Sequence, residues 1–237
     1  EAVLKPEKVS LEEAAASSSA ITARNAVMDF CKEGDRVLVL GGSGGVGSAA
    51  IQLAKHHAKA SFVATTSTQT EWCKSLGADE VINYKASDAT PWYERTDWEQ
   101  TKFDVIIDTV GGGNYGENKA SRVLKSGKLG GHFVAVCGDD PKPDCKTWFK
   151  AIKFFAGVLF SWPLYSWWYA STMPSYTLLT PYNITQGRKQ VLDMMASKTL
   201  EIKLDDQSPH AFTAQGVQEA FSVVASGHAH GKVVVRM

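Results

Sequence analysis

Apolar residues along this 237-residue chain alternate between short unbroken runs and longer stretches with helical spacing. The short runs are rich in β-branched residues, which is typical of buried strands. They lie at residues 37–40, 62–66, 81–82, 105–110 and 133–137. Strands that alternate with helices in this order predict an α/β fold with a doubly wound parallel sheet, whose ligands bind at the carboxyl ends of the strands.

Capping signals and apolar spacing predict where the helices lie. Ser10 and Glu13 form a capping box ahead of an Ala-rich helix, and residues 21–30 predict a second, separate helix. Near the C terminus, apolar residues spaced i, i+3, i+4 and i+7 over 217–224 predict an amphipathic helix. Residues 231–235 predict a strand that closes the chain.

The turn after the first strand carries the most specific motif. Gly42, Gly44 and Gly47 have G-x-G-x-x-G spacing, with a strand before them and a small-residue helix after them. The first glycine is expected to allow the tight turn, the second to let the backbone approach a pyrophosphate, and the third to let the helix pack on the sheet. The pyrophosphate would bind free N–H groups at the positive end of the helix. This context predicts a dinucleotide site.

The end of the second strand indicates which dinucleotide binds. An NAD site places Asp or Glu there, on the ribose 2′-hydroxyl. This sequence has Thr65, Thr66 and Ser67 instead. The pattern therefore favours NADPH (NADP+).

Composition and charge exclude some classes of function. Lys plus Arg number 25, as do Asp plus Glu, so the net charge gives no argument for a nucleic-acid partner. The cysteines have no C-x-x-C spacing, which argues against zinc and against a disulfide scaffold. They are Cys31, Cys73, Cys137 and Cys145. His228 and His230 lie in a small-residue turn and are interpreted as solvated loop residues rather than metal ligands.

Residues 148–169 are crowded with aromatic side chains. Polar residues and a proline interrupt them, namely Lys153, Ser161, Pro163 and Ser166. The stretch therefore falls short of the ~20 consecutive apolar residues of a spanning helix, and we expect it to cover an apolar surface at a subunit contact or substrate pocket. The alternative is an interfacial amphipathic segment in peripheral membrane contact, because Trp and Tyr favour the headgroup boundary.

Several stretches, in this order and spacing, resemble one known family. They are KPEKVSLEEAAASSSAITA, GGSGGVGSAAIQLAK, KSLGADEVINYK, FDVIIDTVGG, GGHFVAVCG and SGHAHGKVVVRM. The chain resembles the cofactor-binding Rossmann part of a medium-chain dehydrogenase/reductase, in the zinc-independent quinone oxidoreductase branch that includes zeta-crystallin. Its aromatic segment is closer to the reticulon-interacting, mitochondrial or envelope-associated members.

The resemblance implies residues for the phosphate groups of the cofactor. Those that would hold the pyrophosphate are Ser43, Gly44, Gly45 and Val46. Tyr84 would bind the 2′-phosphate of NADPH, and Ser67 and Lys85 are near enough in sequence to join it. Some members carry a basic residue in the turn after the second strand, where this chain has Gln69.

The resemblance also implies residues for the nicotinamide end. Thr22 would approach it, although its hydroxyl could equally bond its own helix backbone. Gly111 and Gly112 would lie along the nicotinamide ribose. Cys137 and Gly138 would meet the ring through backbone groups, with Cys137 a small buried residue rather than a reactive thiol.

The implied reaction is hydride transfer from the reduced nicotinamide to a quinone or an α,β-unsaturated carbonyl compound. The sequence contains no Ser-His-Asp set, paired catalytic carboxylates or metal cluster, so no general acid is assigned. Asp108 is interpreted as a strand-end residue that satisfies local backbone. One alternative is a dinucleotide-binding redox sensor or scaffold with little catalysis. Another is enoyl reduction within a larger synthase.

Family members carry a GroES-like domain ahead of the cofactor domain. By this resemblance, residues 1–10 are a linker from that domain, 11–203 the Rossmann domain with an aromatic insertion at 148–169, and 204–237 a segment returning to the catalytic domain. The chain alone is expected to bind the dinucleotide but to turn over little quinone, because the opposing domain completes the cleft. The full-length protein is expected to be a homodimer. The expected location is cytoplasmic, with mitochondrion or plastid as the alternative.

Overall fold

The computed structural model describes residues 3–116, 118–138, 147–156, 160, 162–180, 184–227 and 229–237. Its centre is a six-stranded parallel sheet in the order β3-β2-β1-β4-β5-β6. The strands are β1 (Arg36–Leu40), β2 (Phe62–Thr66), β3 (Glu80–Ile82), β4 (Val105–Asp108), β5 (His132–Ala135) and β6 (Ser175–Leu178). The order reverses between β1 and β4, which opens a crevice at their carboxyl ends. The predicted doubly wound α/β fold is confirmed.

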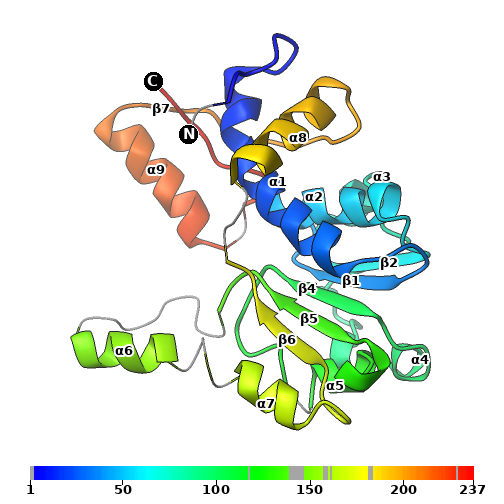
Figure 1. Ribbon diagram of the computed structural model, residues 1–237. Coiled ribbons are helices and arrows are strands. Elements are labelled where there is room, and N and C mark those ends of the chain that lie inside the picture. The colour runs from blue at the N-terminus through cyan, green and yellow to red at the C-terminus, as the bar shows by residue number, and fades with distance from the viewer. Residues whose placement is uncertain are drawn as a thin grey trace.

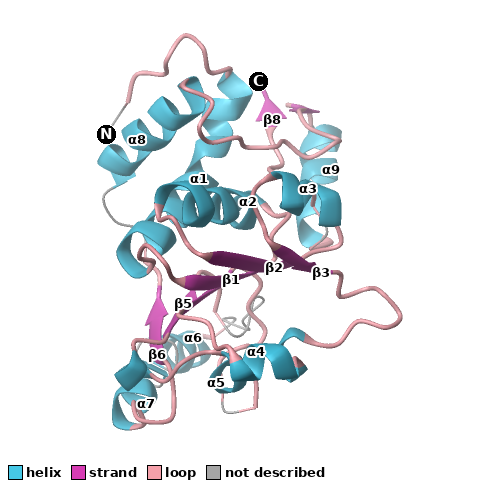
Figure 2. Cartoon of the chain, turned by 90° about the vertical axis from the view of Figure 1, so that its right-hand side faces the viewer, coloured by secondary structure: helices cyan, strands magenta, loops and turns pink. Residues whose placement is uncertain are grey.

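Helices pack on both faces of the sheet, as Figure 2 shows with the strands between two helical layers. Successive residues of β1 point to opposite faces, so Val37 and Val39 enter one apolar cluster and Leu38 and Leu40 the other. Helices of the first layer are α1 (Leu11–Phe30), α2 (Gly45–Gln52), α3 (Thr70–Ser75) and α8 (Ile184–Ala196). Helices of the second layer are α4 (Thr96–Gln100), α5 (Ala120–Val123) and α7 (Trp162–Trp168).

The predicted break between two N-terminal helices is wrong, because α1 is continuous. Its capping box is confirmed: the Glu13 amide donates to Ser10 Oγ at 3.1 Å, and the Ser10 amide donates to Glu13 Oε2 at 2.7 Å. The Ser-rich stretch between the two predicted helices is helical, and the Ser17 hydroxyl donates to the Ala14 carbonyl at 2.7 Å. Small side chains there also let α1 pack closely against α2.

Strand ends differ from the prediction at several places. Strands β4 and β5 end at Asp108 and Ala135, before the predicted residues 110 and 137, because the chain turns there into glycine-containing loops. Strand β6 was not predicted from the sequence. The closing strand is only β8 (Val235–Arg236), paired with β7 (His210–Ala211) in a small second sheet.

The predicted C-terminal amphipathic helix is α9 (Ala214–Ala225), capped by the Thr213 hydroxyl. Figure 1 shows α9 away from the central sheet, beside β7. Its apolar stripe is covered only in part, because Ala220 is buried whereas Phe221 is 70% exposed and Val224 is 58% exposed. The proposed boundaries at residues 10 and 203 remain predictions.

The aromatic segment covers an apolar surface only in part. It includes α6 (Trp148–Ala156) and α7. On α7, Trp162 and Tyr165 pack toward the sheet, and the Trp162 ring lies 5.1 Å from that of Tyr115. Other side chains face outward, namely Trp148, Phe149, Ile152, Leu164, Trp167 and Trp168. Within the described ranges, no helix has the length and apolar character needed to cross a membrane.

Candidate functional site

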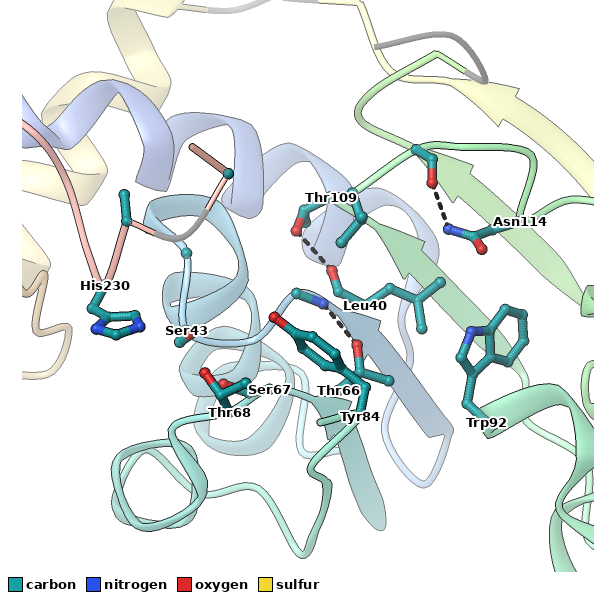
Figure 3. A pocket seen from close by; sticks show the side chains of 16 residues that line it. Leu40, Ser43, Thr66, Ser67, Thr68, Tyr84, Trp92, Thr109, Asn114 and His230 are labelled. Carbon is teal, nitrogen blue, oxygen red and sulfur yellow. Dashed lines mark hydrogen bonds between the residues drawn. The ribbon is translucent and has the colours of Figure 1, made fainter. Parts of the chain in front are cut away.

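A cavity of about 590 Å³ opens at the carboxyl ends of β1, β2 and β4. Its position follows from the sheet register, which aligns Leu40 with Thr66 on one side and with Asp108 on the other. Figure 3 shows the side chains around it. Its lining is Leu40, Gly41, Ser43, Gly44, Thr66, Ser67, Thr68, Tyr84, Trp92, Thr109, Val110, Gly111, Asn114, Gly227, Ala229 and His230. Three elements separated in sequence therefore build one site.

The glycine loop forms one wall of the cavity. A Cβ on Gly47 would lie 2.1 Å from the Gly41 carbonyl oxygen, so only glycine lets α2 approach the turn. This confirms the packing role of Gly47. The tight turn itself falls on Gly41, with φ of +85°, and not on Gly42 as expected. Gly42 is instead required because a Cβ there would lie 2.1 Å from Thr65 Oγ1.

The start of α2 is suited to an anion. Gly44 is the N-cap and makes no side-chain capping bond. The first-turn N–H groups are therefore not capped by this residue and lie at the positive end of the helix dipole. Ser43 and Gly44 line the main cavity, whereas Gly45 and Val46 line an adjoining one of about 290 Å³.

The adjoining cavity continues the main cavity, since both are lined by Gly44, Thr109, Gly227 and Ala229. Lys232 lies in its wall, and burial lowers the pKa of this ammonium group. An anion at the start of α2 would favour the charged form of Lys232.

The end of β2 forms the opposite wall. Ser67 is buried, and its hydroxyl accepts the Gln69 amide at 3.0 Å. Tyr84, after β3, is 52% exposed and lines the same cavity. Among the described residues that line the cavity there is no Asp or Glu, and the preference for a 2′-phosphate remains a prediction. Lys85 does not line either cavity; its amide donates to Asn83 Oδ1 at 3.1 Å.

Asp108 organises the loop after β4. Its Oδ1 accepts the amides of Val110 at 2.9 Å and Gly111 at 3.0 Å, and its Oδ2 accepts Asn114 Nδ2 at 3.1 Å. The residue is 2% exposed. The interpretation of Asp108 as a carboxylate that satisfies local backbone is confirmed.

The predicted nicotinamide residues from β4 and β5 come together. A Cβ on Gly111 would lie 2.4 Å from the Gly138 carbonyl oxygen and 3.3 Å from the Cys137 Cβ. The Cys137 thiol donates to the Thr109 carbonyl at 3.4 Å. Burial, followed by the charge of Asp108, raises the pKa of Cys137, so the thiol stays protonated at neutral pH. Thiol chemistry is not needed to explain this residue.

Besides Lys85, Cys137 and Gly138, the predicted residues Thr22 and Gly112 lie outside both cavity walls. The Thr22 hydroxyl donates to the Ser18 carbonyl at 3.4 Å within α1, which is the local alternative considered for it. Gly112 has φ of +83° and faces open space. The roles of both toward the nicotinamide remain predictions.

His230 is the main site residue that sequence reasoning missed. It lies in a loop and is partly exposed, as the sequence predicted, but it also lines the main cavity and contacts Gln69. No local signal could have placed it there, since the C-terminal segment returns to β2 only in the folded chain. Thr109, which the sequence placed inside the predicted strand 105–110, was also missed. His228 lies outside the described residues.

A family model described as zinc-binding dehydrogenase matches residues 76–235. The 2-methylene-furan-3-one reductase of Solanum lycopersicum is 33% identical over 98% of this chain and 48% of its own length. The chloroplastic NADPH-dependent alkenal/one oxidoreductase of Arabidopsis thaliana is 30% identical over 98% of this chain and 49% of its own length. The human mitochondrial NAD(P)H oxidoreductase RTN4IP1 is 29% identical over 92% of this chain and 52% of its own length. The chain thus spans about half the length of these relatives.

The family model is named for zinc, but the residues present do not fit a zinc site. Nowhere in the described ranges do three or more His, Cys, Asp or Glu side chains form a group that could hold a metal ion. We therefore assign no residue of this chain to zinc.

A solved quinone oxidoreductase from Coxiella burnetii shares the fold, with a TM-score of 0.70 and 24% identity over 99% of this chain and 63% of that one. The family model, in turn, covers more than half of this chain. The protein therefore belongs to the zinc-binding dehydrogenase family, within the medium-chain dehydrogenases/reductases, a family of oxidoreductases that use a nicotinamide cofactor.

Proposed function

We propose that this chain provides the cofactor site of an NADPH-dependent oxidoreductase that reduces a quinone or an α,β-unsaturated carbonyl compound. The observation that carries the proposal is the cavity at the sheet crevice, with a glycine loop on one wall and no carboxylate at the end of β2. Relatives named as an alkenal/one oxidoreductase and a furanone reductase support this substrate class. We further propose that the full-length protein acts as a homodimer.

Each wall of the site has a separate task in this proposal. N–H groups at the start of α2 bind the pyrophosphate, and Ser67 and Tyr84 bind the adenosine ribose with its 2′-phosphate. Backbone groups of Gly111 and Gly138 fix the nicotinamide end, because their close approach leaves room only for main chain. Reduced nicotinamide supplies the hydride when it is bound. The residues of this chain orient the cofactor, and none is assigned to proton transfer.

Turnover with matched acceptors tests the function. NADPH oxidation by the full-length protein is followed by absorbance with a soluble quinone, an α,β-unsaturated ketone and the corresponding saturated ketone. We expect oxidation with the first two and little with the third, because hydride addition to these acceptors is favoured by the conjugated electrophilic carbon. Equal rates with the saturated ketone would contradict the proposed substrate class.

A sensor or scaffold with little catalysis is the second candidate. The uncovered faces of α6, α7 and α9 favour it. It predicts NADPH binding without oxidation by any of the three acceptors. The same assay therefore separates the two functions.

We also propose that contact with a membrane, where it occurs, is peripheral. Exposed Trp167 and Trp168 on α7 could enter a headgroup layer, but a helix of this length cannot span a bilayer. Protein that sediments with anionic vesicles is expected to return to the supernatant after treatment with alkaline carbonate. Retention in the pellet after carbonate treatment would contradict this prediction.

A further inference from the structure

The peptide unit between Leu40 and Gly41 lies where β1 ends and the glycine loop begins. The register partners of Leu40 are the last residues of β2 and β4, namely Thr66 and Asp108. Ladder hydrogen bonds satisfy backbone groups only as far as the strands stay paired. Beyond Leu40, other groups must hold the backbone of the turn, because buried N–H and C=O groups need partners.

Two threonine hydroxyls hold this peptide unit, one from the end of β2 and one from the residue after β4. The Thr109 hydroxyl donates to the Leu40 carbonyl at 2.7 Å, and the Gly41 amide donates to Thr66 Oγ1 at 3.1 Å. The N–H and C=O of a trans peptide point in opposite directions, so the two bonds lie on opposite sides of the same unit. Figure 3 shows both bonds as dashed lines.

The main chain of the same two threonines also binds the turn. The Thr66 carbonyl accepts the Gly42 amide at 3.0 Å, so Thr66 accepts two consecutive amides of the turn. The Thr109 amide donates to the Leu40 carbonyl at 3.3 Å, a longer bond than that from its hydroxyl. These bonds end at Gly42. They fix the turn without occupying the N–H groups at the start of α2.

Glycine at position 41 explains why such a hold is needed. Its φ is +85°, and glycine adopts positive and negative φ about equally readily, so the residue itself does not select one orientation of the peptide. A Cβ on Gly41 would lie 2.7 Å from Thr109 Oγ1. The hydroxyl therefore packs against bare backbone in the space that a side chain would fill. Contacts from the two threonines restrict the turn where its own sequence does not.

We propose that the Thr66 and Thr109 hydroxyls act together as positioning groups, which keep the Leu40–Gly41 peptide and the glycine loop in the orientation that binds the dinucleotide. The proposal rests on the proposed cofactor site, but not on its choice between NADPH and NADH. A loop with several orientations binds with an affinity reduced by the fraction in the competent one. Each hydroxyl raises that fraction, because turning the peptide over would break both bonds. The pyrophosphate is common to both dinucleotides, so the effect should be equal for each.

The test measures dissociation constants of NADPH and NADH by calorimetric titration, and the free energy of unfolding in urea, for the whole chain and its variants. Thr66→Val and Thr109→Val remove the hydroxyl and nearly keep the side-chain shape, whereas Thr66→Ser and Thr109→Ser keep the hydroxyl. Thr65→Val is the matched control, because the buried Thr65 hydroxyl donates to the Val39 carbonyl at 2.7 Å within the sheet and lines neither cavity.

Thr109→Val keeps the proposal testable even where Thr66→Val fails to fold. It leaves the Leu40 carbonyl its second donor, the Thr109 amide, so no buried backbone group loses every partner. Thr66→Val removes the acceptor printed for the Gly41 amide and should be the less stable of the two.

We expect Thr66→Val and Thr109→Val each to raise both dissociation constants about tenfold, with the ratio between the two dinucleotides unchanged. The serine variants should bind within about twofold of the unmodified chain, and so should Thr65→Val, although it also loses a buried hydrogen bond. Because one peptide unit carries both bonds, the double valine variant should weaken binding by clearly less than the about hundredfold product of two independent losses.

Valine variants that bind both dinucleotides as tightly as the unmodified chain would overturn the proposal. An equal loss of affinity in Thr65→Val would also overturn it, since the loss would then follow stability and not the position of the turn. A full product in the double variant would contradict joint action of the two hydroxyls. If the unmodified chain bound neither dinucleotide, the proposed function would fail, and this proposal with it.

Discussion

Replacing Gly47 with alanine is expected to lower the free energy of unfolding by about 3 kcal/mol and to remove dinucleotide binding. The added Cβ would lie 2.1 Å from the Gly41 carbonyl oxygen and 2.9 Å from the Gly42 Cα, so α2 must move away from the turn. Backbone atoms cannot rotate away as a flexible side chain can. The helix propensity gained from alanine, about 1 kcal/mol, does not offset this clash. Urea unfolding and calorimetric titration with NADPH measure the two effects.

Gly44→Ala is the matched control within the same motif. Its Cβ would meet the Gly41 carbonyl oxygen at 3.5 Å, an ordinary contact, and its φ of −73° suits any residue. We expect unchanged stability with NADPH affinity reduced about tenfold or more, because the methyl group occupies the backbone surface offered to the pyrophosphate. If Gly47→Ala were as stable as the unmodified chain and bound NADPH normally, the assigned packing role would be wrong.

Asp108→Ala should destabilise the protein by about 3 kcal/mol, because it removes the acceptor of the Val110 and Gly111 amides from a position that is 2% exposed. Asp108→Asn keeps an oxygen for both amides and loses mainly the bond to Asn114, so its expected cost is about 1 kcal/mol. Thermal or urea unfolding of both variants measures the difference.

The Asp108→Asn variant also distinguishes a structural role of the carboxylate from a catalytic role. A structural carboxylate predicts that Asp108→Asn keeps most of the cofactor affinity and any turnover. A large loss of turnover in a fully stable Asp108→Asn protein would instead assign a catalytic role to the carboxylate.

Local patterns predicted the strands and the glycine loop because those features depend on neighbouring residues. The apolar run at 37–40 predicts a strand that is buried on both faces. The G-x-G-x-x-G spacing likewise predicts the packing role of Gly47. The Asp108 prediction succeeded for the same reason, since its partners lie within six residues. Ligand-binding roles at these positions remain predictions that binding experiments must test.

Features that depend on distant contacts were not predictable in this way. The edge strand β6 (Ser175–Leu178) is short and only partly buried, so its pattern carries little strand signal. His230 enters the site only because Asp205 and the C-terminal segment bring it to β2. The continuity of α1 depended on packing of Ala16 and Ala20 against neighbouring helices, which outweighed the weak helix propensity of the serines between them.

The central claim is that the cavity at the sheet crevice binds NADPH in preference to NADH. Calorimetric titration of the unmodified chain with each dinucleotide tests it most directly. A charge-assisted bond to the 2′-phosphate predicts a dissociation constant at least about tenfold lower for NADPH. Equal affinities for NADPH and NADH, or no binding of either, would contradict the account.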